Sequence, residues 1–322
     1  MLNSQRIFVD AVKRYCSDHR IAVEVRSQGW LIVMRHELRT ELKTELRTRF
    51  TFGYDVGLNS AMAHRIASDK SATAEVLALS GIACVPHTLF LHPRLNAHIP
   101  SQGSWEAMLR LLDENPRGLV VKPNEGTSGR DLVLATKRLA LELAVNRIFS
   151  SHPGLAISPY VEIEDEIRVV LIDDMAAVVY RKDRPSVLGD GELSLLELAL
   201  AATPPERRST VLPGMLADID RAELDAILPR GRRRVLNWRH NLDSGAVPVV
   251  LDDGDIRQTC VQLAVTAAKA IGIRFASVDV VRVDGGWRVL EINSGVMMEA
   301  LSRLHPELVY ATYSAALDKV FE

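Results

Sequence analysis

"LVVKPNEGTSGRDLVL", residues 119–134, sets two short apolar runs on either side of a polar segment. Apolar and polar residues alternate at each end, which is typical of a half-buried strand. The middle of the stretch is rich in glycine and hydroxyl side chains and does not suit a strand interior. The stretch therefore predicts a β-hairpin with a flexible polar tip.

This tip has two alternative interpretations. It contains neither the P-loop pattern nor the GxGxxG pattern of dinucleotide-binding folds. Gly126 and Gly129 nevertheless allow close backbone approach, and Thr127, Ser128 and the backbone N–H groups can donate to phosphate oxygens. Lys122, at the end of the first strand, would add a positive charge. The alternative is an ordinary long hairpin loop.

Outside this hairpin, the chain alternates helices with antiparallel strand pairs. Helices are predicted over 6–19, 67–81 with Ser68 as the cap, 104–118, 136–151 and 255–273, and a strand is predicted over 82–86. Strand pairs are predicted over 21–35 and 275–295, and 155–182 is predicted to hold one strand, a break and then an antiparallel pair that turns at 173–174. The segment 36–50 fits either a solvated helix or a charged strand. The fold class is mixed α+β rather than a doubly wound sheet.

The composition limits the classes of function. The 322 residues are enough for two or three lobes, and 47% of them are apolar. A net charge of −2 gives no reason to expect a nucleic acid or membrane surface as partner. No apolar run approaches the roughly 20 residues that span a bilayer, and no signal peptide is evident. Cys16, Cys84 and Cys260 lack metal or redox spacing, so we expect free thiols in the cytoplasm.

The last strand pair carries a candidate metal site. Glu291 and Asn293 are two residues apart on a predicted strand, so their side chains share one face. A turn at 284–286 places Asp279 roughly opposite Glu291. Two carboxylates and an amide oxygen suit a hard cation such as Mg²⁺. The alternative is a solvated polar sheet face.

Two further groups of polar residues are candidates for binding. In "SPYVEIEDE" (158–166) a strand stops abruptly, which leaves backbone groups for a planar purine edge and carboxylates for ribose hydroxyls. A solvated acidic turn is the alternative. A cationic floor for a phosphoryl group would come from residues on neighbouring segments, for which surface ion pairs are the alternative: Arg168, Arg181, Lys182, Arg239 and Asn241.

Several stretches, in order, resemble the ATP-grasp carboxylate–amine ligases, most of all the ATP-grasp module of cyanophycin synthetase and of bifunctional glutathione synthetases. They run from about residue 59 to 300: "NSAMAHRIASDKSATAEVLALSGIACVP", "VVKPNEGTSGRDLVLA", "YVEIEDEIRVVLID", "YRKDRPSVLGDGELSLLEL", "NLDSGA" and "FASVDVVRVDGGWRVLEINSG". The resemblance implies an ATP-grasp fold, in which two α+β lobes grip ATP beside a small N-terminal α/β region. It divides the chain into an N-terminal region (1–85), a small lobe (86–157) and a large lobe (158–322). The chain departs from the family after Asn293, where a Pro-Gly segment is replaced by "SGVMMEAL".

The resemblance also implies roles for individual residues. Lys70 and Lys122 would hold the nucleotide phosphates, and residues 124–130, with Gly126, Thr127, Ser128 and Gly129, would close over them. Ser158, Tyr160 and Val161 would lie at adenine, and Glu166 at ribose. Asp279, Glu291 and Asn293 would bind Mg²⁺, or Mn²⁺ in its place. Arg181 and Asn241 would face the reacting phosphoryl group, together with Arg168 and Arg239.

The implied activity is an ATP-dependent ligase that activates a carboxylate as an acyl phosphate and joins it to an amine, releasing ADP and phosphate. The substrates would be amino acids or small peptides, and the resemblance leaves room for a homodimer. A phosphotransferase and a non-catalytic nucleotide-binding subunit on the same scaffold stay open as alternatives.

Overall fold

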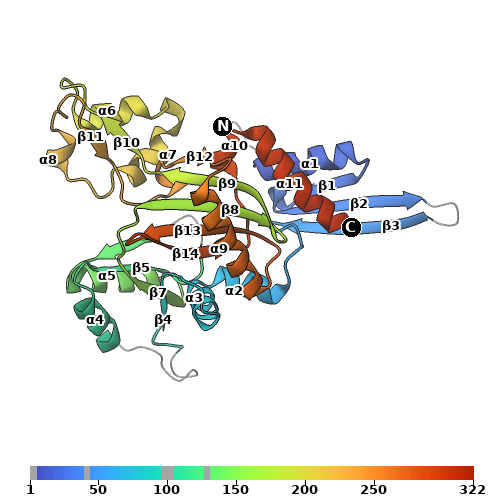
Figure 1. Cartoon of the computed structure of the whole chain (residues 1–322), viewed down its shortest axis with the longest axis horizontal. Coiled ribbons are helices and arrows are strands. Elements are labelled where there is room, and N and C mark those ends of the chain that lie inside the picture. Colours follow the sequence, from blue (N-terminus) through green and yellow to red (C-terminus); the bar gives the residue numbers. More distant parts are fainter. Residues whose placement is uncertain (1–5, 40–43, 96–104, 127–130) are drawn as a thin grey trace.

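The computed structural model describes residues 6–39, 44–95, 105–126 and 131–322. In the described residues, the chain forms a central five-stranded antiparallel sheet and three smaller sheets, with helices packed around them (Figure 1). The hairpin tip 127–130, with Thr127, Ser128 and Gly129, lies outside the described residues. The mixed α+β class predicted from the sequence is confirmed, and antiparallel pairing accounts for all the strand ladders described between named strands.

The central sheet has five strands in the order β12-β9-β8-β13-β14. Its strands are β8 (Asp165–Ile172), β9 (Met175–Asp183), β12 (Val247–Val250), β13 (Phe275–Val283) and β14 (Gly286–Asn293). One face packs against α2 (Ala61–Ser68), α3 (Lys70–Leu79) and the long helix α9 (Asp255–Ile271).

Alternation along these strands fixes which side chains face which layer. Ile167 and Val169 of β8 and Val179 of β9 pack toward α9. Val170 and Tyr180, one residue out of phase, pack into the core on the other face. Side chains of a strand alternate between the two faces of a sheet. The side chains that face away from α9, in step with Val170 and Tyr180, can therefore line a site on that second face.

The small lobe is a four-stranded sheet covered by two helices. Its order is β4-β7-β5-β6, built from β4 (Thr88–Leu91), β5 (Leu119–Pro123), β6 (Val133–Ala135) and β7 (Gly154–Pro159). The covering helices are α4 (Trp105–Glu114) and α5 (Arg138–Phe149), which share one hydrophobic cluster with the sheet. The predicted hairpin of 119–134 is confirmed, with Leu119 paired to Ala135.

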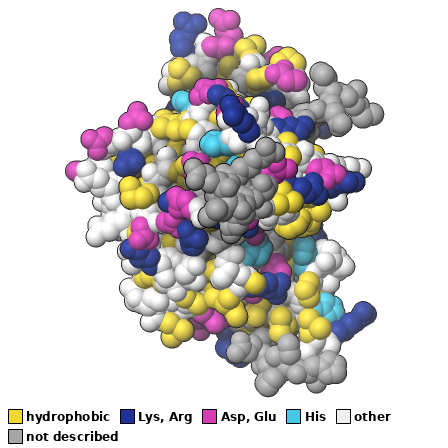
Figure 2. All heavy atoms as spheres, turned by 90° about the vertical axis from the view of Figure 1, so that its right-hand side faces the viewer, with side chains coloured by type: hydrophobic (Ala, Val, Ile, Leu, Met, Phe, Trp, Pro, Cys, Tyr) yellow, Lys and Arg dark blue, Asp and Glu magenta, His cyan; other side chains and the backbone are white. Residues whose placement is uncertain are grey.

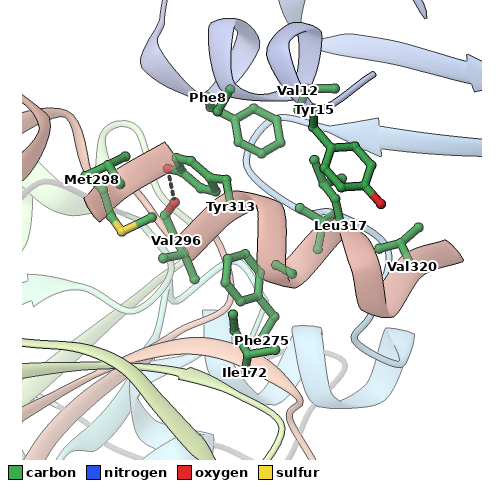
Figure 3. Close-up of a cluster of buried hydrophobic side chains, with 14 of the residues drawn as sticks. Phe8, Val12, Tyr15, Ile172, Phe275, Val296, Met298, Tyr313, Leu317 and Val320 are labelled. Carbon is green, nitrogen blue, oxygen red and sulfur yellow. Dashed lines mark hydrogen bonds between the residues drawn. The ribbon is translucent and has the colours of Figure 1, made fainter. Parts of the chain in front are cut away.

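The two ends of the chain pack together on the central sheet. The N-terminal part consists of α1 (Ile7–Asp18), β1 (Ala22–Arg26), the short η1 (Ser27–Gly29), β2 (Leu31–Arg39) and β3 (Thr44–Phe52). It packs on α10 (Glu299–Ser302) and α11 (Pro306–Phe321) at the C-terminus. Phe8 and Tyr313 meet edge-on at 5.1 Å between ring centroids, and the Tyr313 hydroxyl donates to Val296 O at 2.8 Å (Figure 3).

The β2–β3 hairpin projects away from the rest of the molecule (Figure 1). Its segment 36–50, left open between helix and strand, is strand on both sides of residues 40–43. Leu46, Phe50 and Phe52 of β3 are exposed. Seen from this side, charged side chains of both signs are interspersed with apolar ones (Figure 2).

A separate small cluster covers residues 186–236. Its elements are β10 (Ser186–Leu188), α6 (Leu195–Ala202), α7 (Pro205–Met215), α8 (Arg221–Leu224) and β11 (Arg233–Val235), followed by η2 (Leu242–Ser244). These helices and strands share their own hydrophobic core around Val187, Leu195 and Val211. The basic run 230–235 therefore includes the whole strand β11, and two of its arginines pair with acids: Arg230 with Glu192 and Arg234 with Glu223.

Two local predictions were wrong. The helix predicted over 67–81 is two helices that meet at Asp69, so Asp69, whose side chain accepts from Ala72 N–H at 2.8 Å, caps α3 in place of Ser68. The strand predicted over 82–86 is an irregular segment with a single bridge from Cys84 to Val289, because its contact with the edge strand β14 is limited to two backbone hydrogen bonds, from Val85 N–H to Val289 O and from Val289 N–H to Ala83 O, each at 2.9 Å. Gly81, predicted to end the helix, does lie in the left-handed region with a φ of 69°.

Candidate functional site

A cavity opens between the small-lobe sheet and the inner face of the central sheet. Its lining gathers most of the predicted site residues: Lys70, Lys122, Gly126, Ser158, Tyr160, Val161, Glu166, Arg168, Arg239, Asn241, Asp279, Glu291 and Asn293. These positions are spread over more than 220 residues of sequence, so the fold alone brings them together. Of the predicted residues that the structure describes, Arg181 alone does not line the cavity.

Two lysines from different elements stand at one end of the cavity. Lys70 begins α3, and its Nζ donates to Gly126 O at 2.9 Å, which ties the start of the helix to the segment leading into the hairpin tip. Ser71 N–H donates to Asn124 Oδ1 at 3.2 Å and supports the same junction. The positive charge of Lys70 is thus held beside the segment predicted to cover phosphate.

Lys122 is the second lysine and is almost completely buried on β5. Burial lowers its pKa to about 8, opposed by the attraction of Glu291 and reinforced by the repulsion of Lys70. Among the described residues no carboxylate forms an ion pair with it. A buried cation without a partner is costly, and it suits an anionic ligand such as a phosphate.

The segment after β7 offers backbone groups to a flat ligand. Tyr160 N–H donates to Gly118 O at 2.9 Å, whereas Val161 N–H has no backbone acceptor within the described part of the chain. The Tyr160 ring meets the Trp238 ring edge-on at 5.6 Å between centroids. The apolar side chains of Val120 and Leu290 complete the lining near these groups. Such a slot suits a planar heterocycle that also accepts a hydrogen bond.

The floor of the cavity is a buried network of four charges. Arg168 binds Asp279 in a bidentate pair, with Nε–Oδ1 at 2.7 Å and Nη2–Oδ2 at 2.6 Å. Lys182 Nζ lies 2.8 Å from Asp279 Oδ2 and 2.5 Å from Glu166 Oε1. Burial alone would raise the pKa of Asp279, but Arg168 and Lys182 outweigh it and hold that pKa well below its usual range.

The three predicted metal ligands lie as the strand register requires. Asp279 pairs with Glu291 across β13 and β14, and Asn293 Nδ2 donates to Glu291 Oε1 at 3.2 Å. Glu291 and Asn293 are half-buried and line the cavity, so their oxygens fit a hard cation that also binds phosphate. Both oxygens of Asp279 are occupied by Arg168 and Lys182. Three or more His, Cys, Asp or Glu side chains do not gather into a metal-binding group anywhere in the described residues.

Arg181 lies on the opposite face of the sheet. Its Nε donates to Asp165 Oδ1 at 2.9 Å, and it shares the phase of Val179, which packs toward α9. Lys182, the next residue, points to the cavity and is buried. Strand alternation therefore puts Lys182, and not Arg181, at the position from which a side chain reaches a ligand.

Three further predicted site residues, Arg239, Asn241 and Glu166, are at the cavity. Arg239 lies over the Trp238 ring, and its Nη2 donates to Leu132 O at 3.3 Å. Asn241 caps η2, with its side chain accepting from Asp243 N–H at 2.7 Å. Glu166, predicted at ribose, lines the cavity and is buried, and its Oε1 accepts a hydrogen bond from Lys182 Nζ.

Sequence reasoning missed several lining residues. His240 and Trp238 adjoin predicted residues, so their proximity was a usable signal. Met297 and Glu299 come from the segment after Asn293, where the chain departs from the family pattern, and nothing in their local sequence marks them. Glu299 accepts a hydrogen bond from the Tyr54 hydroxyl, which ties this end of the cavity to the N-terminal part.

The two-lobed arrangement with a cavity between antiparallel sheets defines the ATP-grasp class of fold. The structure superposes on a bifunctional glutathione synthetase from Pasteurella multocida with a TM-score of 0.56 and 17% identity, covering 97% of this chain and 44% of that one. It also superposes on a D-alanine–D-alanine ligase from Bacillus anthracis with a TM-score of 0.53 and 16% identity, covering 82% and 69%. The chain therefore has an ATP-grasp fold.

Sequence comparison shows which proteins of this fold the chain is similar to. Residues 228–306 match the family described as the RimK-like ATP-grasp domain. The chain is 26% identical over 253 residues to a cyanophycin synthetase from Synechocystis, covering 73% of this chain and 27% of that protein. It is 25% identical over 246 residues to a probable alpha-L-glutamate ligase from Enterobacter, covering 76% and 62%. The chain thus spans less than two thirds of the length of these relatives. In the described residues, no helix is long and apolar enough to cross a membrane.

Proposed function

We propose that the protein is an ATP-dependent carboxylate–amine ligase. The observation that carries the proposal is the cavity that gathers two lysines, a buried Arg–Asp–Lys–Glu network and the Glu291–Asn293 pair. Relatives with this fold include proteins named as ligases of glutamate and of D-alanine. A C–N ligation therefore agrees with both the site and the relatives.

ATP would enter with adenine beside Tyr160 and Val161 and with its phosphates toward Lys70 and Lys122. Val161 N–H would donate to the purine edge, and the partnerless charge of Lys122 would be neutralised by phosphate oxygens. Gly126, with a φ of 143°, would let the backbone beside Lys70 approach the phosphates closely. Thr127, Ser128 and Gly129 keep their expected role as a cover over the triphosphate.

The metal ion of the proposal is Mg²⁺, with Mn²⁺ as a substitute. Glu291 and Asn293 would hold it, with Asp279 beside them as the anchor that positions Arg168 and Lys182. Bound there, the ion would neutralise phosphate charge and assist transfer to the carboxylate.

The residues of this chain would stabilise the charges of the reacting groups and would not form a covalent bond to the substrate. A carboxylate and a triphosphate repel each other, so the reaction depends on cations that bring them together. Lys182 and Arg168 would face the developing acyl phosphate, and Arg239 and Asn241 would contribute from the same cavity. The amine then forms the C–N bond, and phosphate departs with the electrons of the C–O bond. Closure would exclude the water that competes for the acyl phosphate.

The substrates of the proposal are a small-molecule carboxylate and an amine, each an amino acid or small peptide. Location in the cytoplasm is part of the same proposal, and it is supported by three free cysteines. A homodimer is also proposed, with the projecting β2–β3 hairpin as the candidate contact element. Analytical ultracentrifugation would test the dimer.

The direct test is a phosphate-release screen with ATP and Mg²⁺ over pairs of amino acids. We expect at least one pair to release phosphate in amounts equal to a new amide, identified by mass spectrometry. Glu291→Ala should abolish this release while the protein stays folded. Near-native release by this variant would contradict the metal assignment, and release with a stable phosphorylated product in place of an amide would favour a phosphotransferase.

A further inference from the structure

His240 is a buried cavity residue that the chemistry above leaves unused. It is 6% exposed, lines the cavity, and stands between the predicted residues Arg239 and Asn241. Its Nδ1 lies 2.6 Å from Lys182 O. A backbone carbonyl can only accept a hydrogen bond, so Nδ1 must carry a proton. In the neutral imidazole, the lone pair is therefore on Nε2.

Nε2 has no hydrogen-bond partner among the described residues. Leaving a buried acceptor unpaired costs free energy, and the cost is removed if a ligand supplies a donor. The contact to Lys182 O fixes the ring beside the same lysine that pairs with Asp279 and Glu166. This basic nitrogen thus belongs to a residue that lines the cavity next to Lys182.

We propose that His240 Nε2 accepts the proton of the attacking amine. This inference rests on the proposed ligase function. The amine nitrogen forms a bond to the acyl carbon, the bond from that carbon to the phosphate oxygen breaks, and phosphate leaves with the electron pair. The amine N–H proton passes to Nε2, which leaves an imidazolium with both nitrogens protonated, and the proton then returns to solvent.

The test separates proton acceptance from carboxylate activation. Hydroxylamine is unprotonated near neutral pH and traps acyl phosphates as hydroxamates without help from a base, whereas an amino acid amine is mostly protonated. The experiment therefore measures, on the full-length protein with ATP and Mg²⁺, the rate of amide formation and the rate of hydroxamate formation from the same carboxylate.

His240→Asn is the informative variant, because the Asn amide N–H₂ can replace Nδ1 as donor to Lys182 O while the basic nitrogen is lost. We expect amide formation to fall about 100-fold or more, in the range for loss of a general base, with hydroxamate formation little changed. His240→Gln, which keeps more of the side-chain volume, should show the same split, and it replaces His240→Asn if that variant does not fold.

His87 provides a matched control. It is also 6% exposed, its Nδ1 lies 2.9 Å from Val85 O, and its Nε2 lacks a partner among the described residues, but it does not line the cavity. His87→Asn should leave the ratio of amide to hydroxamate unchanged. Equal loss of both products in the folded His240 variants, or loss of neither, would overturn the role of His240. If the wild-type protein forms neither product from any pair, it is the ligase proposal that fails.

Discussion

Lys122 is a cavity residue that we expect to destabilise the free protein and to strengthen the binding of an anionic ligand. Its charge is buried, with no ion-pair partner in the part of the chain that the structure describes, and burial lowers its pKa from 10.5 to about 8. Since the folded-state pKa lies below the unfolded one, the folded state disfavours the charged form. The cost is fully present below pH 8 and is relieved as the pH rises from about 8 toward 10.5.

We therefore expect Lys122→Met to stabilise the free protein at pH 7 by roughly 1–3 kcal/mol, since a shift of one pKa unit corresponds to about 1.4 kcal/mol. The gain should shrink as the pH approaches 10, and ATP binding should be lost. Chemical denaturation at pH 7 and pH 10, with ATP titration by calorimetry, measures both effects. If the variant were less stable than wild type at pH 7, the buried charge of Lys122 would not destabilise the folded protein.

Asp279 and Glu291 differ in what their loss should do, although both are predicted metal ligands. When the charge of Asp279 is removed, Arg168 loses its ion-pair partner, and Lys182 keeps Glu166 as its partner. Two buried cations then face one buried carboxylate. Asp279→Asn should therefore destabilise the fold by about 3–5 kcal/mol, as expected for breaking a buried ion pair. Glu291→Gln, at a half-buried residue, should change stability by less than about 1 kcal/mol while abolishing turnover. Urea denaturation of both variants distinguishes them, and equal destabilisation would contradict this division of roles.

At the scale of single elements, strand alternation in β9 decides between two neighbouring cations. Arg181 pairs with Asp165 on the α9 side, and Lys182 pairs with Glu166 and Asp279 at the cavity. We expect Lys182→Met to lower kcat by at least about 100-fold, because a group facing transferred charge is lost, and Arg181→Met to change it little. Steady-state kinetics on the two variants test this, and the reverse order of effects would restore the original assignment of Arg181.

The hairpins show what the sequence can predict at this scale. A turn at 284–286 predicted Asp279 roughly opposite Glu291, and the two residues do pair; the strict antiparallel period from the turn would pair Asp279 with Leu290, and a β-bulge between Asp279 and Val280 shifts the register by one residue. The same period could not assign Arg181 and Lys182 to their faces, since that depends on which face of the sheet α9 covers. The segment 36–50 stayed ambiguous because its strand form is stabilised by distant contacts, such as the hydrogen bond from Arg49 Nε to Val320 O.

At the scale of the whole molecule, the chain ends form one core. Phe8 of α1 and Tyr313 of α11 are fully buried together with Phe275 of the central sheet (Figure 3). Such contacts join residues about 300 positions apart, and no local pattern predicts them. The segment 295–300, which lines the cavity, is fixed by this core through Val296 and Met298, and this explains why its role was missed.

Because α1 packs in this core, it helps to hold the segment 295–300 at the cavity. Phe8→Ala should destabilise the protein by about 3–5 kcal/mol, the range for removing a large buried side chain. Because Tyr54, which packs beside Phe8, also binds Glu299, the variant should raise KM for one substrate more than it changes ATP affinity. Thermal unfolding and substrate titration measure the two effects. A folded variant of unchanged stability would contradict a core shared by both chain ends.

The central claim is that a carboxylate is activated by phosphoryl transfer from ATP in the cavity between the two sheets. The most direct measurement supplies the carboxylate substrate labelled with ¹⁸O and follows the released phosphate by mass spectrometry. The account predicts one ¹⁸O atom in the phosphate for each amide formed, because the bridging oxygen of the acyl phosphate leaves with phosphorus. Amide formation with unlabelled phosphate would contradict it.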